Sequence, residues 1–337
     1  MGNRKEHHYL PRFYLKNFSV GQQEVHIRLH NIESDFYFDH AAISDQAKKK
    51  YLYGKDDIME SQLEKLEGHS SGVIRSIIDD DQLPSSAADL LQLGKFILFQ
   101  QARTVRHGEV MNTVFNTLNQ GMFGDEAPDD EMSIRDMLEL MTKRLPYLAH
   151  LDYKLIINDT SIPFITSDNP VVLYNQMMEI KRHRTPAAWA NMGLQVFFPI
   201  SPDHLIYIHD SNNYIAGAPA GTTVIGNITE RDVNQLNALQ YLNCGELLFF
   251  DEHFDKGNAE SLKKESQEFR EKLWIPKHVS FGSFHWVDMG RPQINLQVSF
   301  SRLSPRGKQF KPGNRMVYLR HPDFYELRES LVPDEMQ

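Results

Sequence analysis

Cysteine is nearly absent from this sequence, which carries Cys244 alone among 337 residues. A single thiol excludes an intramolecular disulfide, and this favours a reducing compartment. Cys244 follows the largely apolar run Leu239–Asn243 and has no basic neighbour that would lower the pKa of its thiol. We therefore expect Cys244 to be a buried structural residue rather than a nucleophile.

Long apolar runs are missing as well. No segment approaches the roughly 20 consecutive apolar residues that a membrane span requires. Residues 1–8 are polar and contain no apolar core of a secretory signal. These absences predict a cytoplasmic protein that makes no membrane contact.

An excess of basic residues is also lacking. The chain has 36 Lys and Arg against 45 Asp and Glu, for a net charge of −9. A surface that tracks duplex phosphates usually has a basic excess, so we expect no broad duplex-binding surface. This balance still allows a local pocket for a nucleotide or RNA. The fifteen histidines are scattered, without the fixed spacing of a zinc signature.

Several motifs that identify enzyme classes do not occur. The sequence has no Gly-x-x-x-x-Gly-Lys-Ser/Thr loop, no Gly-x-Gly-x-x-Gly fingerprint, no Gly-x-Ser-x-Gly elbow and no His-Glu-x-x-His pair. These absences argue against P-loop hydrolysis, Rossmann dehydrogenation and zincin proteolysis.

The patterns that are present predict an α+β fold. Apolar residues recur at helical spacing through 56–79, 85–119 and 133–145, where Pro146 ends the last helix. Residues 24–38 predict a strand or hairpin, and Ser201-Pro202-Asp203-His204 predicts the turn of a second hairpin.

We expect these elements to form one domain over residues 1–337. Residues 1–150 are mainly helical and 151–300 mainly strand, so a helical layer should pack on a mainly antiparallel sheet. Residues 301–337 are expected to form a peripheral tail.

Four blocks of residues carry a resemblance to a known family. They are His8-x-x-Pro11-x-x-Tyr14-Leu15-x-x-Phe18, the acidic helix Glu60–Glu67, Gln100-Gln101-Ala102-Arg103-Thr104, and Thr166-Ser167-Asp168-Asn169-Pro170 with its echo in residues 198–202. In this order, over about residues 7–250, the chain resembles a bacterial family catalogued as domain of unknown function number forty-two thirty-eight. The resemblance implies this fold and supplies no established activity. The chain departs from the family at Val105, where proline often stands and would kink the helix.

The acidic helix and the arginine block offer the first candidate site residues. Glu60, Glu64 and Glu67 are spaced i, i+4 and i+7, so a helix places their carboxylates on one face. This row is either a ligand set for a divalent cation, a source of a general base, or a solvated face. Arg103 either clamps a phosphate or carboxylate, or pairs with Glu64 or Asp168 to join two elements.

The remaining candidates come from the first and last blocks. His8, beside an aromatic segment, is either a general acid or base or a histidine satisfied by local hydrogen bonds. Ser167-Asp168-Asn169 follows an apolar strand, a common place for functional polar groups. The same residue types are ordinary turn formers, whose side chains bond to local amides.

Together these residues predict a hydrolase that acts on a phosphodiester in RNA or a nucleotide. His8 is assigned as the general acid or base, Glu64 or Asp168 as a base or ligand, and Arg103 as the group that stabilises phosphate charge. Further candidates are Gln101, Ser167 and Asn169 for binding, and Glu60, Glu64 and Asp168 for a divalent cation. By analogy alone, families of this kind often supply toxin or phage-defence effectors. The alternative is a non-enzymatic module that binds a small ligand or a protein, in which these polar residues form a structural network.

Overall fold

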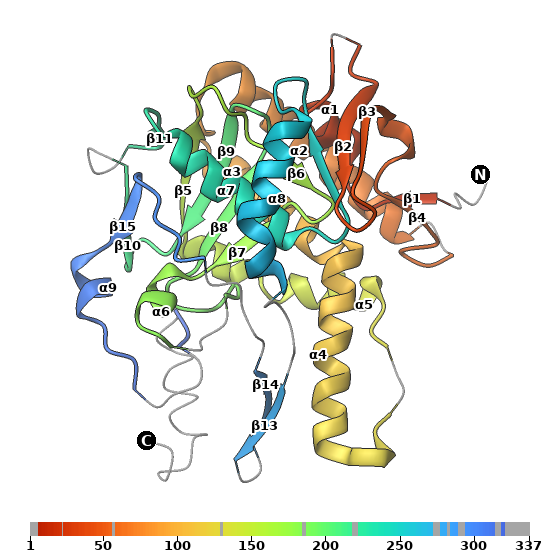
Figure 1. Cartoon of the computed structure of the whole chain (residues 1–337). Coiled ribbons are helices and arrows are strands. Elements are labelled where there is room, and N and C mark those ends of the chain that lie inside the picture. The colour runs from red at the N-terminus through yellow and green to blue at the C-terminus, as the bar shows by residue number, and fades with distance from the viewer. Residues whose placement is uncertain are drawn as a thin grey trace.

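A computed structural model gives the structure of residues 6–21, 23–55, 58–128, 131–183, 187–217, 222–271, 277–281, 284–288, 294–313 and 318–320 (Figure 1). In chain order its elements are β1 (Glu6–His8), α1 (Arg12–Lys16), β2 (His26–Asn31), β3 (Phe36–Ala42), the 3-10 helix η1 (Ile43–Asp45), β4 (Lys48–Lys50), α2 (Ile58–Asp80), α3 (Ala87–Ala102), α4 (Val105–Phe123), η2 (Gly124–Glu126), α5 (Ile134–Thr142), η3 (Leu145–His150), β5 (Asp152–Ile157), β6 (Thr166–Ser167), β7 (Val172–Tyr174), α6 (Gln176–Ile180), β8 (Gln195–Pro199), β9 (His204–His209), β10 (Tyr214–Ala216), β11 (Val224–Ile225), α7 (Glu230–Asn243), β12 (Leu247–Phe250), α8 (Lys256–Glu271), β13 (Lys277–Phe281), β14 (Phe284–Asp288), β15 (Ser301–Leu303) and α9 (Pro305–Gln309). The predicted α+β class is confirmed.

A five-stranded sheet in the order β11-β5-β9-β8-β7 forms the centre of the fold. Its pairs are antiparallel, except that β11 runs parallel to β5. The predicted hairpin is the β8–β9 pair, in which Phe197 lies opposite Tyr207 and Ser201 and His204 form the turn.

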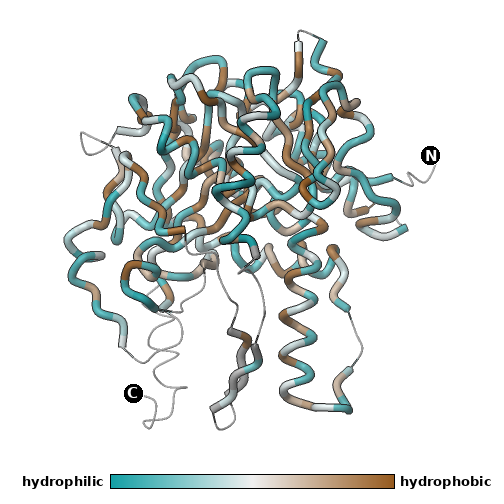
Figure 2. The backbone as a smooth tube through the Cα atoms, viewed as in Figure 1, coloured by the Kyte–Doolittle hydropathy of each residue, from teal (hydrophilic) through white to brown (hydrophobic). Residues whose placement is uncertain are grey.

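Alternate residues of this sheet pack on opposite helical layers. Leu155 belongs to the same apolar cluster as Phe96 and Ile97 of α3, whereas the next residue, Ile156, belongs to the cluster of Leu236 of α7. This alternation follows from the period-two geometry of a strand. The sheet therefore lies between α3 and α7, and the apolar segments gather in the interior of the body (Figure 2).

A second sheet combines strands that lie far apart in the chain. Its order is β3-β2-β12-β6, so the predicted strand or hairpin in residues 24–38 pairs with a strand that follows it by about two hundred residues. The N-terminal part of the chain therefore contributes strands as well as helices. Its strands β2 and β3 belong to the same sheet as β12 and β6.

The helix predicted over residues 85–119 is wrong as a single element. The chain breaks after Ala102, and Thr104 adopts an extended conformation with φ −74° and ψ 147°. Its hydroxyl accepts a hydrogen bond from the backbone N–H of His107, which makes Thr104 the N-cap of α4. The break between α3 and α4 thus occurs without the proline expected from the family pattern.

Helix α4 projects from the body of the fold and contacts the β13–β14 hairpin (Figure 1). No helix among the described residues is long and apolar enough to cross a membrane. Residues 321–337, the larger part of the predicted tail, lie outside the described residues.

Candidate functional site

A cleft of about 820 Å³ lies between the N-terminal segment and α2. This volume falls in the range of small-molecule sites, about 300–1,000 Å³. Two walls of different chemistry enclose the cleft. The lining residues are Glu6, His8, Pro11, Arg12, Phe13, Tyr53, Glu60, Leu63, Glu64, Glu67, Gly68 and Ser71.

The α2 wall carries the carboxylates that the sequence placed on one helical face. Glu60, Glu64 and Glu67 all line the cleft, which confirms that they share a face. Glu60 has a side chain that is 15% exposed, and its Oε2 lies 3.4 Å from Nε2 of the buried His7. Glu67 Oε1 accepts a hydrogen bond from Arg103, at 2.5 Å. Glu60 and Glu67 are therefore held by groups behind the wall.

His8 on the opposite wall is fixed by two hydrogen bonds. Its Nδ1 lies 3.1 Å from the carbonyl oxygen of Gln46, and its Nε2 lies 3.3 Å from Nε of Arg12. A carbonyl only accepts and a guanidinium only donates, so Nδ1 carries the proton and Nε2 offers its lone pair. His8 is therefore held as a neutral ring with its basic nitrogen beside Arg12.

Burial lowers the pKa of His8 below its usual value of 6.5, and the charge of Arg12 lowers it further. The Gln46 carbonyl and the Glu67 carboxylate act in the opposite direction but do not reverse the shift. Burial raises the pKa of Tyr53, whose hydroxyl donates to the carbonyl oxygen of His8 at 3.0 Å. Tyr53 thus acts as a neutral support for the backbone of this wall.

We predict that Arg12→Ala raises the pKa of His8, because the substitution removes a positive charge that disfavours the imidazolium. The folded wild-type protein binds fewer protons at His8 than the unfolded chain does, so this group lowers stability as pH falls through 6.5. An NMR titration of the His8 ring measures the shift. Lys16→Ala, on the same short helix, is the control and should leave the midpoint unchanged. An unchanged titration midpoint in Arg12→Ala would show that Arg12 does not lower the pKa of His8.

Lysines of β4 extend the wall that contains His8. Residues directly opposite in an antiparallel pair share a face of the sheet. Lys50 lies opposite Glu6 and Lys48 opposite His8, so both lysines project on the same face as these cleft residues. Lys48 is bonded to Glu6 at 2.9 Å. The wall that contains His8 therefore combines the basic Arg12 with the acidic Glu6, and it faces the carboxylates of α2.

Arg103, predicted to stabilise phosphate charge, does not line the cleft. Its side chain is 2% exposed, and it donates from Nε to Oε1 of Gln100 at 2.8 Å and from Nη1 to Glu67. It thus joins two helices, but through Glu67 rather than through Glu64 or Asp168. Gln100 in turn donates to the carbonyl oxygen of Tyr9 at 2.9 Å, so this network positions the segment that carries His8.

Asp168 lies in a second network, away from the residues that line the cleft. Its carboxylate accepts hydrogen bonds from the backbone N–H groups of Gly245, Glu246 and Leu247, at 2.6, 2.8 and 3.1 Å. Burial raises the pKa of Asp168, against the effect of these three donors. The carboxylate thus fixes the chain between α7 and β12.

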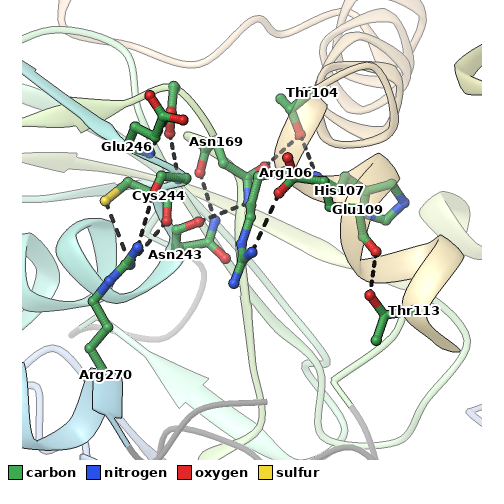
Figure 3. Close-up of polar contacts among 12 residues, drawn as sticks. Thr104, Arg106, His107, Glu109, Thr113, Asn169, Asn243, Cys244, Glu246 and Arg270 are labelled. Carbon is green, nitrogen blue, oxygen red and sulfur yellow. Dashed lines mark hydrogen bonds and ion pairs between the residues drawn. The ribbon is translucent and has the colours of Figure 1, made fainter. Parts of the chain in front are cut away.

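Ser167, Asn169 and Gln101 are also hydrogen-bonded to other parts of the fold. Ser167 donates to the side chain of Gln240 at 2.9 Å, and Gln101 accepts from the indole N–H of Trp189 at 2.6 Å. Asn169 accepts from Thr104 at 2.8 Å and donates to the carbonyl oxygen of Asn243 at 3.0 Å (Figure 3). These contacts belong to the packing of α3 and α7 and lie outside the cleft.

The four sequence blocks are thus parts of one interlocked unit. A comparison with family models matches residues 6–254 to the family described as "Protein of unknown function (DUF4238)". The chain belongs to this family. No curated protein and no solved structure matches it.

In this DUF4238 chain the first block also bonds directly to the last. The hydroxyl of Tyr14 lies 2.5 Å from Oγ1 of Thr166 and donates to the carbonyl oxygen of Pro199 at 2.8 Å. Asn17 donates to the carbonyl oxygen of Ile200. Tyr14 and Asn17 therefore hold the N-terminal segment on the sheet. The candidate site residues that line the cleft are His8, Glu60, Glu64 and Glu67.

The predicted metal set of Glu60, Glu64 and Asp168 is divided between two places. Glu60 and Glu64 line the cleft, and Asp168 is bonded to the backbone after α7. Within the described part of the DUF4238 chain, no group of three or more His, Cys, Asp or Glu side chains is arranged to hold a metal ion.

Sequence reasoning missed Arg12, Tyr53 and Lys48 as groups at or beside the cleft. Arg12 stands four residues after His8, and the motif between them gave no sign that their side chains meet. Lys48 lies opposite His8 only because β4 pairs with β1, which no local pattern predicts. Cys244, in contrast, is buried as expected, and burial raises the pKa of its thiol.

Proposed function

We propose that the cleft is an acid–base site at which this protein hydrolyses a phosphodiester in RNA or a nucleotide. The observation that carries the proposal is the pair of hydrogen bonds that fixes His8 as a neutral ring with Nε2 as acceptor. A general base for chemistry near neutral pH needs an available lone pair and a defined orientation. His8 has both.

Arg12 replaces Arg103 as the group proposed to bind the phosphate. Arg12 lines the cleft and is exposed, whereas Arg103 is bonded to Gln100 and Glu67. A phosphate oxygen attracts the guanidinium more strongly than a neutral imidazole does. Binding of the substrate would therefore draw Arg12 away from His8 and release Nε2 for its role as a base.

The proposed reaction is a displacement at phosphorus. Water, or the 2′-hydroxyl of a ribonucleotide, gives its proton to Nε2 of His8 as its oxygen bonds to phosphorus. The bond from phosphorus to the leaving oxygen breaks, and the imidazolium returns the proton to that oxygen. Arg12 offsets the charge that develops on the phosphate.

The acidic wall supports a second function, the binding of a small ligand that carries a cationic group. Glu60, Glu64 and Glu67 present three carboxylates on one face, and an amine or guanidinium would be attracted to this face. In that case Arg12 on the opposite wall would contact an anionic part of the same ligand and no bond would be broken. This ligand-binding function corresponds to the non-enzymatic alternative predicted from the sequence.

The test is an assay of the purified full chain with an RNA oligonucleotide and with a cyclic 2′,3′-nucleotide. We expect His8→Ala to reduce hydrolysis by about 100-fold or more, in line with the loss of a general base. His69→Ala is the matched control, because His69 lies on α2 with a side chain that is 56% exposed and does not line the cleft. Both variants should melt at the wild-type temperature.

Two outcomes would contradict the hydrolase proposal. One is a wild-type protein that cleaves neither substrate, and the other is a His8→Ala variant that cleaves as fast as wild type. If spermidine raises the melting temperature of the inactive wild type, and Glu64→Gln abolishes this shift, the binding function is supported instead.

A further inference from the structure

The cleft presents hydrogen-bond acceptors on the wall that faces His8 and Arg12. Glu60, Glu64 and Glu67 line it from α2. An ionised carboxylate accepts hydrogen bonds and donates none. A substrate whose phosphate binds at Arg12 would therefore meet an opposite wall that attracts N–H and O–H groups. The same wall would repel carbonyl oxygens and the lone pairs of ring nitrogens.

Glu64 is the middle carboxylate of this row. Towards the start of α2, Oε2 of Glu60 lies 3.4 Å from Nε2 of His7. Towards the end of the helix, Oε1 of Glu67 accepts a hydrogen bond from Arg103. The row extends over roughly 10 Å of helix, at about 1.5 Å per residue. A flat group that lies against the middle of the wall therefore has Glu64 as its nearest carboxylate.

Open space follows Glu64 along the same face of α2. Gly68 and Ser71 stand four and seven residues after Glu64, and both also line the cleft. A Cβ atom placed on Gly68 would meet no heavy atom within 4 Å. The helix surface thus leaves room for a flat ligand beside the Glu64 carboxylate.

An aromatic ring lines the same cleft. Phe13 follows Arg12 on α1, and both residues belong to the lining. The Phe13 side chain is partly buried and packs on Phe96, with 5.7 Å between the ring centroids. Nucleobases stack on aromatic side chains with little preference among the bases, because every base has a π-face. Phe13 would therefore add affinity for a nucleobase without selecting one.

We propose that Glu64 makes the cleft selective for guanine, an inference that rests on the phosphodiester site proposed above. The Watson–Crick edge of guanine carries two adjacent donors, N1–H and the N2 amino group, which match the two oxygens of one carboxylate. Adenine and cytosine present an amino donor next to a ring-nitrogen lone pair. Uracil presents one N–H between two carbonyl oxygens. Each of these three bases would place an acceptor against an acceptor.

The charge of the carboxylate increases this selectivity. Hydrogen bonds to an ionised acceptor are roughly twice as strong as those between neutral groups. A bidentate pair between a side chain and a base typically separates the right base from a wrong one by about tenfold or more. Glu60 and Glu67, on either side of Glu64, add to the repulsion of acceptor edges. The substrate class at this site is therefore guanosine-containing RNA or a guanosine nucleotide.

The first test measures binding rather than cleavage, by titration calorimetry of the full chain with the four nucleoside 3′-monophosphates. We expect the guanosine compound to bind at least about tenfold more tightly than the other three. Glu64→Gln should remove this preference, because an amide would set its own N–H against a guanine donor. Asp80→Asn is the matched control, since it neutralises an exposed carboxylate of α2 outside the cleft. It should keep the preference, and both variants should melt at the wild-type temperature.

The second test separates stacking from base recognition. Phe13→Leu keeps an apolar side chain against Phe96 but removes the ring. It should weaken all four nucleotides to a similar extent and leave their ratio unchanged. Inosine 3′-monophosphate lacks the N2 amino group, so the wild type should bind it more weakly than the guanosine compound. In Glu64→Gln the two compounds should bind equally.

The proposal is overturned if the four nucleotides bind the wild type equally, or if none binds. It is also overturned if Glu64→Gln weakens all four equally, because the carboxylate would then contact the ribose that they share. Cleavage of RNA without a preference for guanosine would overturn the selectivity and leave the hydrolase proposal standing. A guanosine preference in binding, lost in Glu64→Gln, supports the guanine site even if no RNA is cleaved and the hydrolase proposal fails.

Discussion

Replacing Arg103 by alanine is expected to lower the free energy of unfolding by about 3–5 kcal/mol, the range seen when one partner of a buried charged network is removed. The guanidinium is 2% exposed and satisfies Gln100 and Glu67, and it lies 5.9 Å from the ring centroid of Phe96. Alanine would leave the side-chain oxygen of Gln100 without a donor in a dry interior, and it would leave a cavity beside Phe96.

Urea denaturation followed by circular dichroism measures this loss. Arg106→Ala is the matched control, because Arg106 is 28% exposed and lies 3.5 Å from Glu109, so its removal should cost within about 1 kcal/mol. Arg103→Lys should fall between the two, since an ammonium group cannot reproduce the forked geometry. A loss below about 1 kcal/mol in Arg103→Ala would show that the buried network contributes little to folding.

The position of Arg103 changes how an activity assay should be interpreted. Gln100, bonded to Arg103, also holds the carbonyl oxygen of Tyr9, which follows His8 in the chain. Disturbing Arg103 would therefore move the cleft wall without removing a group that contacts substrate. Reduced activity in Arg103→Ala would identify a positioning residue, and only His8 and Arg12 variants test the chemistry directly.

Features that depend on near neighbours in the chain were predictable from sequence. The shared face of Glu60, Glu64 and Glu67 follows from helical periodicity, and the β8–β9 hairpin follows from its turn residues. The burial of Cys244 follows from its apolar run. In each case the information lies within about a dozen residues, so long-range packing did not alter the result.

Features that depend on distant pairing were not predictable in the same way. The sequence offered Glu64 or Asp168 as partners for Arg103, and the packing of α2 on α3 pairs it with Glu67 instead. The break between α3 and α4 depends on Thr104, whose hydroxyl also donates to Asn169 some 65 residues later. A local pattern of apolar residues continues through this point, so periodicity alone predicts one helix.

The family blocks thus describe mainly how the N-terminal segment is attached to the sheet. Tyr14 reaches Thr166, Thr104 reaches Asn169 and Gln100 reaches Tyr9, and each bond joins one block to another. Polar residues in a shared motif are often assigned to catalysis, but here most of them satisfy buried partners. The cleft lies between α1 of this attached segment and α2.

Asp168 binds the backbone between α7 and β12, and Asp168→Asn is expected to cost about 2–4 kcal/mol, because charge-assisted hydrogen bonds are lost and a buried N–H is left unpaired. The amide has the same shape as the carboxylate, but its NH₂ group must face one of the three backbone donors at Gly245, Glu246 and Leu247. Two donors would then point at each other in a site that is 7% exposed.

Asp251→Asn separates this effect from the general cost of changing a buried carboxylate. Asp251 is 6% exposed and accepts from the backbone N–H of His253 at 3.1 Å, so an amide oxygen can replace its acceptor. We expect the loss for Asp251→Asn to be smaller, and amide hydrogen exchange at residues 245–247 to accelerate only in Asp168→Asn. If exchange there stays slow while stability falls, Asp168 contributes through its charge and not through these three bonds. If neither changes, Asp168 is not needed for folding, and a role of its carboxylate in catalysis would again become the better explanation for its place in the motif.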